Sequence, residues 1–416
     1  MDIFVPVSVK ESAKKVLLKN LEATGGKYVC PSWPHYPHQW LWDSCFHAIS
    51  LSHLGLKDTA KNEVRRLFTF QREDGFIPHI QYISKRARSP IEAERYLYPH
   101  WKNYSSHTQP SVLARTLKSI GDPEFTKEFF LKVKKFLLYF IRFQDPDNDG
   151  LISVFVPTET GRDASPEFDR FYPRIKGWGV LGRTFNTCSY FRRLYWTEFK
   201  YRTIGWDIRR IAKSLVDIED LMFNCMWVDE MYILSNFAES AQEKDELIRL
   251  AKKTERAIIE RCWDQSANTF RCLAKDNSFI MTLAVSNLFP LLLPNLPRKY
   301  AQAILTQLTD TKKFWTPYPI PSVAADEPTF DPDFKEHLLW RGPTWINTNW
   351  YIVIGLLRHG FQNEAHELAT RTIRLVEQEG FREFYQPFTG YGMRVPHFSW
   401  STLAATFDSS FFKPPY

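Results

Sequence analysis

Four short stretches of the sequence combine carboxylic acids or amides with aromatic rings and turn-forming residues. The first is PHYPHQWLWDSCFHA, residues 34–48, and the others are NYSSHTQP (103–110), VPTETGRDASPEFD (156–169) and FREFYQPFTGYG (381–392). Loops that a rigid scaffold positions often carry binding and catalytic residues. Carboxyl groups on such loops can exchange protons with a ligand. Aromatic faces beside them suit ligands with alternating CH and OH surfaces, above all sugars.

Three aromatic residues stand close to one acid in the first stretch. Tyr36, Trp40 and Trp42 precede Asp43, which opens an apolar helical pattern. A carboxylate in that position can cap the helix by accepting hydrogen bonds from free backbone N–H groups. The same carboxylate can bind a pair of sugar hydroxyls between the rings. Both roles stay open for Asp43.

Gln109 and Glu383 are the prominent polar residues of the second and last stretches. Gln109 stands directly before a proline and, with His107, leads into a predicted helix. Capping by Ser or Thr explains part of that stretch but leaves Gln109 unexplained. Glu383 is flanked by Phe384 and Tyr385 and is followed by a turn rich in Pro and Gly, where a surface acid is the ordinary explanation.

The third stretch is too polar for a core segment and contains four acids, Glu159, Asp163, Glu167 and Asp169. Taken singly, each acid has a structural explanation as part of a loop. Two acids in separate Gly- and Pro-containing loops of an aromatic-rich protein are a stronger candidate for chemistry than either acid alone.

The dominant period along the chain is helical. VKESAKKVLLKNLEA (9–23) and AQEKDELIRLAKKTERAIIERCW (241–263) repeat apolar residues at intervals of three and four. GWDIRRIAKSLVDIEDLMFNCMW (205–227) and SFIMTLAVSNLFPLLL (278–293) are each expected to form a helix. In all, twelve or thirteen helices are predicted, most of them ended by Gly, Pro or a polar loop.

Successive helices without a long linker predict one all-α toroid, a single domain over residues 1–416. The chain shows no fixed period of the kind that helical-repeat solenoids have. Short strands are expected only at LISVFV (151–156) and NTFRCLA (268–274). Three long non-helical loops span residues 72–106, 145–173 and 311–342; they are rich in aromatic, acidic and Pro residues and are expected to be functional. The first and the third are expected to close over a substrate.

Composition and charge exclude several classes of protein. Hydrophobic residues make up 44% of the chain and charged residues 24%, which is enough for a sizeable core. The net charge of +7 is scattered, so no nucleic-acid partner is predicted. Six cysteines without a CxxC pair argue against zinc and fit a reducing compartment. With no apolar leader and no apolar run of about 18 residues, we expect a cytoplasmic protein without a membrane partner.

Seven motifs in order along the chain resemble the catalytic (α/α)6 barrel of glycoside hydrolase family 63. They are WLWDSCFHAI, SSHTQP, DPDNDGLI, ETGRDASP, RGPTWINTNW, EFYQPFTGYG and FSWS, between residues 40 and 401. The resemblance covers nearly the whole chain and is closest to the small mannosylglycerate and glucosylglycerate hydrolases. It implies an inverting glycosidase that cleaves an α-glucosidic or α-mannosidic bond without a metal or cofactor.

The resemblance also implies roles for particular residues. Asp163 corresponds to the general acid and Glu383 to the general base, while Asp43 and Gln109 correspond to residues of the sugar subsite. Inverting hydrolysis needs both carboxyl groups, one protonating the leaving oxygen and one activating water on the opposite face. Glu159, Glu167 and Asp169 then belong to the structure of the loop. Substrate-contacting aromatic residues are expected at Tyr36, Trp40, Trp42, Trp340 and Trp345.

Substrate choice depends on the groups around the leaving group. Glycerate is anionic, and Arg162, Arg341 and Arg394 are the candidate cations for it. The glycerate-specific pattern has an aromatic pair before RGP, but this chain reads HLLWRGP, with Leu339 in the first aromatic position. Other α-glucosides and α-mannosides therefore stay open, and so does a homo-oligomer.

Two other kinds of function remain as alternatives. The first is a carbohydrate-binding toroid without catalysis, which would keep Trp40, Trp42 and Trp345 but not bring the two acids together. The second is a sugar epimerase or lyase on the same fold. Such an enzyme would use a pair of histidines in its cleft, and His107 and His397 are the candidates.

The acidic turn DPDNDG, residues 145–150, has the opening spacing of a calcium-binding loop. The twelfth position of such a loop is normally Glu but is Val156 here. The turn is therefore read as a tight acidic turn, and cation binding stays open.

Overall fold

The computed structural model describes most of the chain. The described residues are 5–83, 103–172, 189–190, 192–194, 196–201, 203–204, 211 and 216–412.

Six largely buried elements form a closed inner ring in the described part of the chain. They are α2 (Leu41–His53), α5 (Leu113–Ile120), α9 (Leu221–Ser235), the 3₁₀ helix η6 (Val285–Leu292), α12 (Ile346–Arg358) and the 3₁₀ helix η7 (Ser399–Thr406). Each element contacts the next in this order, and η7 closes the ring against α2. Nearly all residues of α9 are buried, and apolar residues lie on nearly all sides of this helix. This composition is typical of a helix that is buried all round.

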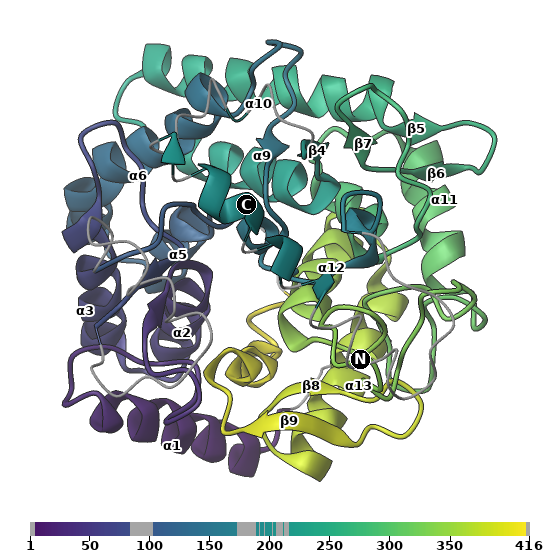
Figure 1. Ribbon diagram of the computed structural model, residues 1–416. Helices are drawn as coiled ribbons and strands as arrows, with labels where there is room; N and C mark the ends of the chain where they lie inside the picture. Colours follow the sequence, from purple (N-terminus) through teal and green to yellow (C-terminus); the bar gives the residue numbers. More distant parts are fainter. Residues whose placement is uncertain are drawn as a thin grey trace.

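An outer layer of six amphipathic helices surrounds this ring (Figure 1). They are α1 (Val7–Ala23), α3 (Lys57–Leu67), α6 (Pro123–Phe143), α10 (Ala241–Arg261), α11 (Arg298–Leu308) and α13 (Gln362–Glu379). Five of them follow an inner element in sequence and pack on it, and α1 packs on η7. Helices paired in this way around a ring confirm the predicted all-α (α/α)6 barrel.

Short antiparallel strands join the loops at the ends of the barrel. They are β1 (Gln39–Trp40), β2 (Ile80–Gln81), β3 (Ser153–Val154), β4 (Ile218–Glu219), β5 (Trp263–Asp264), β6 (Thr269–Phe270), β7 (Leu273–Ala274), β8 (Arg382–Tyr385) and β9 (Gly392–Pro396). β4 lies between β3 and β7, with Glu219 opposite Ser153 and Leu273. The remaining pairs are β1 with β2, β5 with β6 and β8 with β9.

Two segments that were expected to be single helices do not form one continuous helix each. Residues 205–227 include β4, and α9 begins only at Leu221, where the side chain of Asp220 accepts a hydrogen bond of 2.8 Å from the Phe223 N–H. Residues 278–293 are helical only from Val285, and Pro290 lies within that 3₁₀ helix. Pairing with distant strands and a proline without an N–H therefore override the helical pattern.

Several inner elements are capped by side chains from neighbouring elements. The carboxylate of Glu230 on α9 accepts hydrogen bonds from the N–H groups of Ala114 (2.7 Å) and Arg115 (2.9 Å) in the first turn of α5. The side-chain oxygen of Gln109 accepts a hydrogen bond of 3.3 Å from the Trp42 N–H in the first turn of α2. These bonds satisfy donors that a helix leaves free at its N-terminus and join the ring elements together.

One cluster of buried apolar side chains extends from Val5 to Phe407 and includes residues of every inner element. The five described cysteines are buried and free, and Cys188 lies outside the described residues. None of the described helices has both the length and the apolar composition that a membrane crossing requires. Of the three predicted long loops, residues 84–102 and 173 also lie outside the described residues.

Candidate active site

A cavity of about 110 Å³ lies where the N-terminal ends of several inner elements converge. Trp42 and Asp43 belong to the first turn of α2, Gln109 precedes α5, and Trp345 directly precedes α12. Its described lining consists of Pro31, Tyr36, Trp40, Trp42, Asp43, His79, His107, Gln109, Thr158, Gly161, Asp163, Leu194, Glu198, Leu339, Trp340, Trp345, Glu383, Phe398 and Trp400. The two acids that were singled out by resemblance, Asp163 and Glu383, therefore border the same cavity.

A close contact between backbone and ring places Asp163. The loop turns at Gly161, which ends the 3₁₀ helix η4 (Pro157–Thr160) with a φ of +71°. A Cβ atom at Gly161 would lie 2.3 Å from the indole ring of Trp42. Only glycine therefore lets the backbone pass this ring in that conformation, and Asp163 follows two residues later.

The surroundings of Asp163 favour its protonated form. Burial raises the pKa of Asp163 to about 7, the charge of Arg394 works against this shift, and the carboxylate of Glu383 adds to it. The hydroxyl of Tyr190 donates a hydrogen bond of 2.9 Å to the backbone carbonyl of Asp163 and holds the loop beside the cavity. A carboxyl group in this state can hold a proton near neutral pH and donate it.

Glu383 is buried on β8, and its two oxygen atoms have different surroundings. The hydroxyl of Tyr36 (2.9 Å) and the guanidinium of Arg394 (2.5 Å) both donate hydrogen bonds to Oε1. Oε2 is also buried but has no hydrogen-bond partner among the described residues. Burial raises the pKa of Glu383, whereas Arg394 and Tyr36 lower it. Oε1 is thus held by the protein, and Oε2 is the oxygen available to a water molecule or ligand.

Asp43 is a further carboxylic acid at the cavity, which Glu198 also lines. Asp43 is the third residue of α2, and the N-cap position itself is taken by Trp40. Burial raises the pKa of Asp43 well above its usual range, and the charges of Glu383 and Asp163 raise it further. Asp43 and Gln109 line the cavity together, which leaves a ligand-binding role open to both.

Aromatic rings form much of the cavity wall. The rings of Trp340 and Trp345 stack with centroids 3.8 Å apart, and Trp400 meets both Trp42 and Trp345 edge-on. The indole N–H of Trp345 is buried and has no hydrogen-bond partner in the described part of the chain. It can donate to a hydroxyl group of a ligand. Tyr36 and Trp40 also line the cavity, so the structure places all five predicted aromatic residues there.

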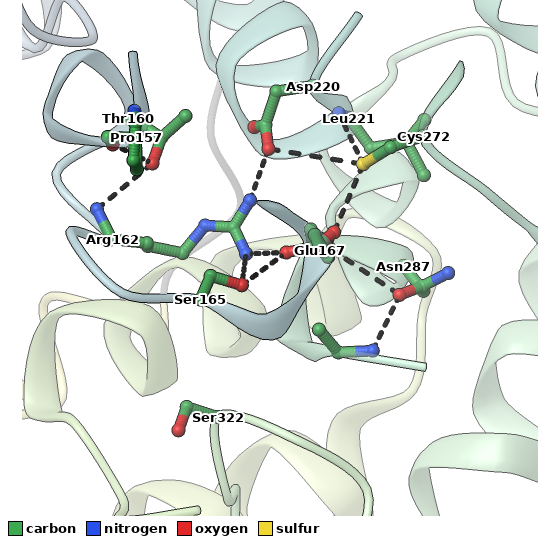
Figure 2. A network of polar contacts seen from close by, with 12 residues as sticks. Pro157, Thr160, Arg162, Ser165, Glu167, Asp220, Leu221, Cys272, Asn287 and Ser322 are labelled. Atoms are coloured by element: carbon green, nitrogen blue, oxygen red, sulfur yellow. Dashed lines mark hydrogen bonds and ion pairs between the residues drawn. The ribbon is translucent and has the colours of Figure 1, made fainter. Parts of the chain in front are cut away.

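Arg162 does not line the cavity as predicted, although it is adjacent to Asp163. Its guanidinium is buried and donates hydrogen bonds to the carboxylates of Glu167 and Asp220 (Figure 2). The hydroxyl of Ser286 (2.6 Å) also donates a hydrogen bond to Glu167. Arg162 therefore anchors the loop that carries Asp163, and its predicted contact with substrate is corrected to a structural role.

Arg341 is also absent from the described cavity lining. Its fully buried guanidinium donates two hydrogen bonds, of 2.8 Å and 2.5 Å, to the carboxylate of Asp169. The prediction of substrate contact by Arg341 is corrected in the same way. Because the two partners are 172 positions apart, this pair joins the loop of Asp163 to the loop before α12.

The other acids of the stretch 156–169 bind within the protein, as was expected. Glu159 accepts hydrogen bonds from the N–H groups of Phe155 (2.6 Å) and Val156 (3.2 Å). Glu167 pairs with Arg162, and Asp169 pairs with Arg341.

Several residues of the cavity lining were not predicted as site residues, among them His79, Phe398 and the buried acid Glu198. The rings of His79 and His107 stack with centroids 3.9 Å apart, and both residues line the cavity. Phe398 lies in the FSWS motif, so its position in that motif could have identified it. The other candidate histidine, His397, is exposed and is not among the described residues of the lining.

The chain is similar to known proteins over most of its length. Residues 36–401 match the family described as mannosylglycerate hydrolase MGH1-like glycoside hydrolase domain. A mannosylglycerate hydrolase of Rubrobacter radiotolerans is 27% identical over 410 residues, covering 90% of this chain and 91% of that protein. A glucosylglycerate hydrolase of Mycolicibacterium hassiacum is 26% identical over 415 residues, covering 90% of this chain and 92% of that protein.

The fold is also found among solved structures. A mannosylglycerate hydrolase of glycoside hydrolase family 63 from Thermus thermophilus, in complex with Tris and D-glycerate, superposes with a TM-score of 0.84. It is 26% identical in sequence, and the match covers 96% of this chain and 99% of that one. With the family match over residues 36–401, these similarities show that the chain belongs to the mannosylglycerate hydrolase MGH1-like family of glycoside hydrolases.

Proposed function

We propose that this glycosidase hydrolyses the α-glycosidic bond of mannosylglycerate or glucosylglycerate with inversion, using Asp163 as general acid and Glu383 as general base. The observation that carries the proposal is that both carboxyl groups border one cavity in unlike surroundings. Asp163 has a pKa of about 7, whereas Glu383 is ion-paired with Arg394. Two carboxyl groups in unlike environments are the usual basis for dividing the acid and base roles.

The proposed reaction has one displacement step. Oε2 of Glu383 takes a proton from a water molecule, whose oxygen attacks the anomeric carbon. Asp163 gives its proton to the glycosidic oxygen as the bond between that oxygen and the anomeric carbon breaks. The products are a hexose of inverted anomeric configuration and glycerate. This route needs a carboxyl separation of about 6.5–9.5 Å, which leaves room for the water.

The remaining lining residues have binding roles in this proposal. Asp43 and Gln109 bind sugar hydroxyl groups, and the N–H of Trp345 donates to another. The stacked rings of Trp340 and Trp345 provide a flat apolar wall for the sugar, with Trp42 beside them. Aromatic walls with a few fixed polar groups are typical of small-ligand sites.

The substrate is proposed from the relatives, which are named for mannosylglycerate and glucosylglycerate. Leu339 lines the cavity, where the glycerate-specific pattern has an aromatic residue. We therefore expect the leaving group to make an apolar contact with Leu339. Comparison of mannosylglycerate, glucosylglycerate and neutral α-glucosides as substrates tests this choice.

We further propose that residues 1–416 act as one catalytic domain in the cytoplasm. The large apolar cluster that extends from Val5 to Phe407 supports one domain. Two carboxyl groups suffice for the hydrolysis, so no cofactor or catalytic metal is needed.

Substitution of the two acids tests the mechanism. Asp163→Asn and Glu383→Gln should each lower kcat by at least about 100-fold, because each removes one proton-transfer group. The far-ultraviolet circular dichroism should stay unchanged. Product analysis by NMR during the first minutes should show the β-anomer from an α-linked substrate. Near-full activity of either variant, or an initial α-anomer, would contradict the proposal.

Two other functions predict different results. A carbohydrate-binding toroid would release no free hexose from any α-glycoside. An epimerase that uses His107 and His397 as a pair is not favoured, because His397 is exposed and absent from the described lining.

A further inference from the structure

One segment of the chain, residues 29–44, supplies much of one wall of the cavity and is called the wall segment below. It runs from the region after α1 through β1 into the first turn of α2. The position of this segment decides where its aromatic rings and its carboxylate meet a ligand. Its members of the described lining are Pro31, Tyr36, Trp40, Trp42 and Asp43.

A buried acid on a neighbouring outer helix binds the wall segment. Glu63 lies on α3, which packs on α2 (Figure 1). Its side chain is only 2% exposed, and Glu63 is not among the described residues of the cavity lining. Glu63 can therefore affect a ligand only through the residues that it contacts.

The carboxylate of Glu63 holds the wall segment at three points. Oε2 accepts a hydrogen bond of 2.8 Å from the Val29 N–H at the start of the segment. Oε1 accepts hydrogen bonds from the side-chain amide of Gln39 (3.0 Å) and the hydroxyl of Ser44 (2.5 Å). Gln39 and Ser44 flank residues 40–43, three of which line the cavity. Glu63 thus holds both ends of the segment and the point where its cavity-lining part begins.

The three partners of Glu63 are as buried as the acid itself. Val29, Gln39 and Ser44 have no exposed surface. A buried donor that loses its acceptor is costly, because water does not reach it to replace the bond. The wall segment must therefore shift when one of these bonds is lost, and residues 40–43 shift with it.

Other hydrogen bonds tie the wall segment to the rest of the site. The Leu41 N–H donates to the His79 carbonyl (2.9 Å), and the Trp42 N–H donates to the side chain of Gln109 (3.3 Å). Both acceptors belong to residues that line the cavity themselves. Glu63 differs from them, because it belongs to the outer layer and ties the wall segment to the scaffold.

We propose that Glu63 is a positioning residue for sugar binding, which holds the wall segment in place from α3 without touching the ligand. It keeps the rings of Trp40 and Trp42 and the carboxylate of Asp43 where a bound hexose meets them. The proposal rests on the proposed function, because it takes the cavity to bind a hexose.

Glu63→Gln tests this role, because an amide has one acceptor oxygen where a carboxylate has two. One end of the wall segment then loses its bond, whereas Asp163 and Glu383 lie on other elements. With mannosylglycerate or glucosylglycerate, KM should rise at least about 10-fold and kcat should change less, as expected when binding shared by the ground state and the transition state is lost.

Glu255→Gln is the matched control. Glu255 lies on the outer helix α10, is 3% exposed and is not among the described lining residues. Its carboxylate accepts hydrogen bonds from the Asn295 N–H (2.7 Å) and the Tyr232 hydroxyl (2.8 Å). Both variants should lose stability in urea, but Glu255→Gln should keep the KM of the unchanged protein.

Ser44→Ala removes a single bond to Glu63 and keeps the test informative if Glu63→Gln fails to fold. Its KM should rise about 3-fold, the effect of one lost hydrogen bond. If the variant that folds has the KM of Glu255→Gln, or if kcat falls while KM stays unchanged, Glu63 does not position the wall segment for sugar binding.

Titration of the tryptophan fluorescence with mannose and with glucose measures sugar binding apart from hydrolysis. Glu63→Gln should bind the hexose at least about 10-fold more weakly than Glu255→Gln. An unchanged protein that binds a hexose but hydrolyses no α-glycoside would refute the proposed function, and the role of Glu63 would stand if this difference in affinity is found. An unchanged protein that binds no hexose and hydrolyses no α-glycoside would overturn both.

Discussion

Arg394 lowers the pKa of the proposed general base, Glu383. Its guanidinium donates hydrogen bonds to Oε1 of Glu383 and to the hydroxyl of Tyr36. Its backbone has a φ of +60°, an uncommon conformation for a residue with a side chain, which turns it toward β8. Glu383 also faces Asp163, Asp43 and His35. Among these groups, Arg394 lowers the pKa of Glu383 most and so opposes the effect of burial.

Loss of the Arg394 cation should move the pH profile of kcat/KM to higher pH. Activity needs ionised Glu383 and protonated Asp163, and Arg394 lowers the pKa of both. In Arg394→Gln, the acidic limb of the kcat/KM profile should therefore move up by about 1 pH unit, and the alkaline limb should follow. The exposed Arg374 provides the control Arg374→Gln, whose profile should not move. An unchanged acidic limb in Arg394→Gln would refute this role.

Removal of the buried charge of Arg162 should lower the stability of the folded protein. Its substitution by Met leaves the buried carboxylates of Glu167 and Asp220 without their cation. We expect the free energy of unfolding in urea to fall by about 3–5 kcal/mol. Arg170→Met removes a similar pair with Asp276 at the surface and should have little effect. Equal effects of the two substitutions would show that the buried network does not stabilise the fold.

At the scale of the elements, the contact between the loop after η4 and α2 depends on one glycine. Gly161→Ala should push the loop away from Trp42, because the new Cβ atom would overlap the ring. Gly360 has a similar φ of +77° but has no atom within 4 Å of the added Cβ. Both variants should lose about 1 kcal/mol from the backbone conformation alone. Only Gly161→Ala should also lose at least about 10-fold in kcat, as expected when a catalytic group is displaced.

Measurement of kcat and of urea unfolding in both variants separates these effects. A Gly161→Ala variant with the kcat of Gly360→Ala would show that the contact with Trp42 does not place Asp163.

The sequence predicted elements best where local pattern decides them. The outer helices α1 and α10 have amphipathic periods that the sequence shows, and both form as expected. The segment 205–227 was predicted wrongly because β4 forms through pairing with β3 and β7, which are distant in sequence. The roles of Arg162 and Arg341 were predicted wrongly for a related reason. Their partners Asp220 and Asp169 come near only when the barrel closes.

At the scale of the whole molecule, the first helix closes the ring. The side-chain amide of Asn20 on α1 donates hydrogen bonds to the His397 carbonyl (2.9 Å) and the Ser399 hydroxyl (2.8 Å). It also accepts one of 3.2 Å from the Trp33 N–H. Lys10 pairs with Asp408 at 2.8 Å. Residues near the two ends of the described chain therefore hold α1 against η7.

Removal of this amide should weaken the closure. Asn20→Ala leaves several buried groups without partners, so the free energy of unfolding should fall by about 1–3 kcal/mol. Asn236→Ala removes an exposed amide that bonds to Tyr232 and should change stability much less. Thermal unfolding of both variants checks this expectation. If they have the same Tm, the bonds of Asn20 do not hold the ring closed.

Four of the six inner elements begin at the cavity, namely α2, α5, α12 and η7. The segments before them can therefore be varied while the helices behind them keep their packing. A mutant library confined to positions such as Leu339 and Phe398 would change the selectivity of the pocket and spare the scaffold. The architecture thus offers protein engineers a small set of sites at which to redirect the enzyme to new glycosides.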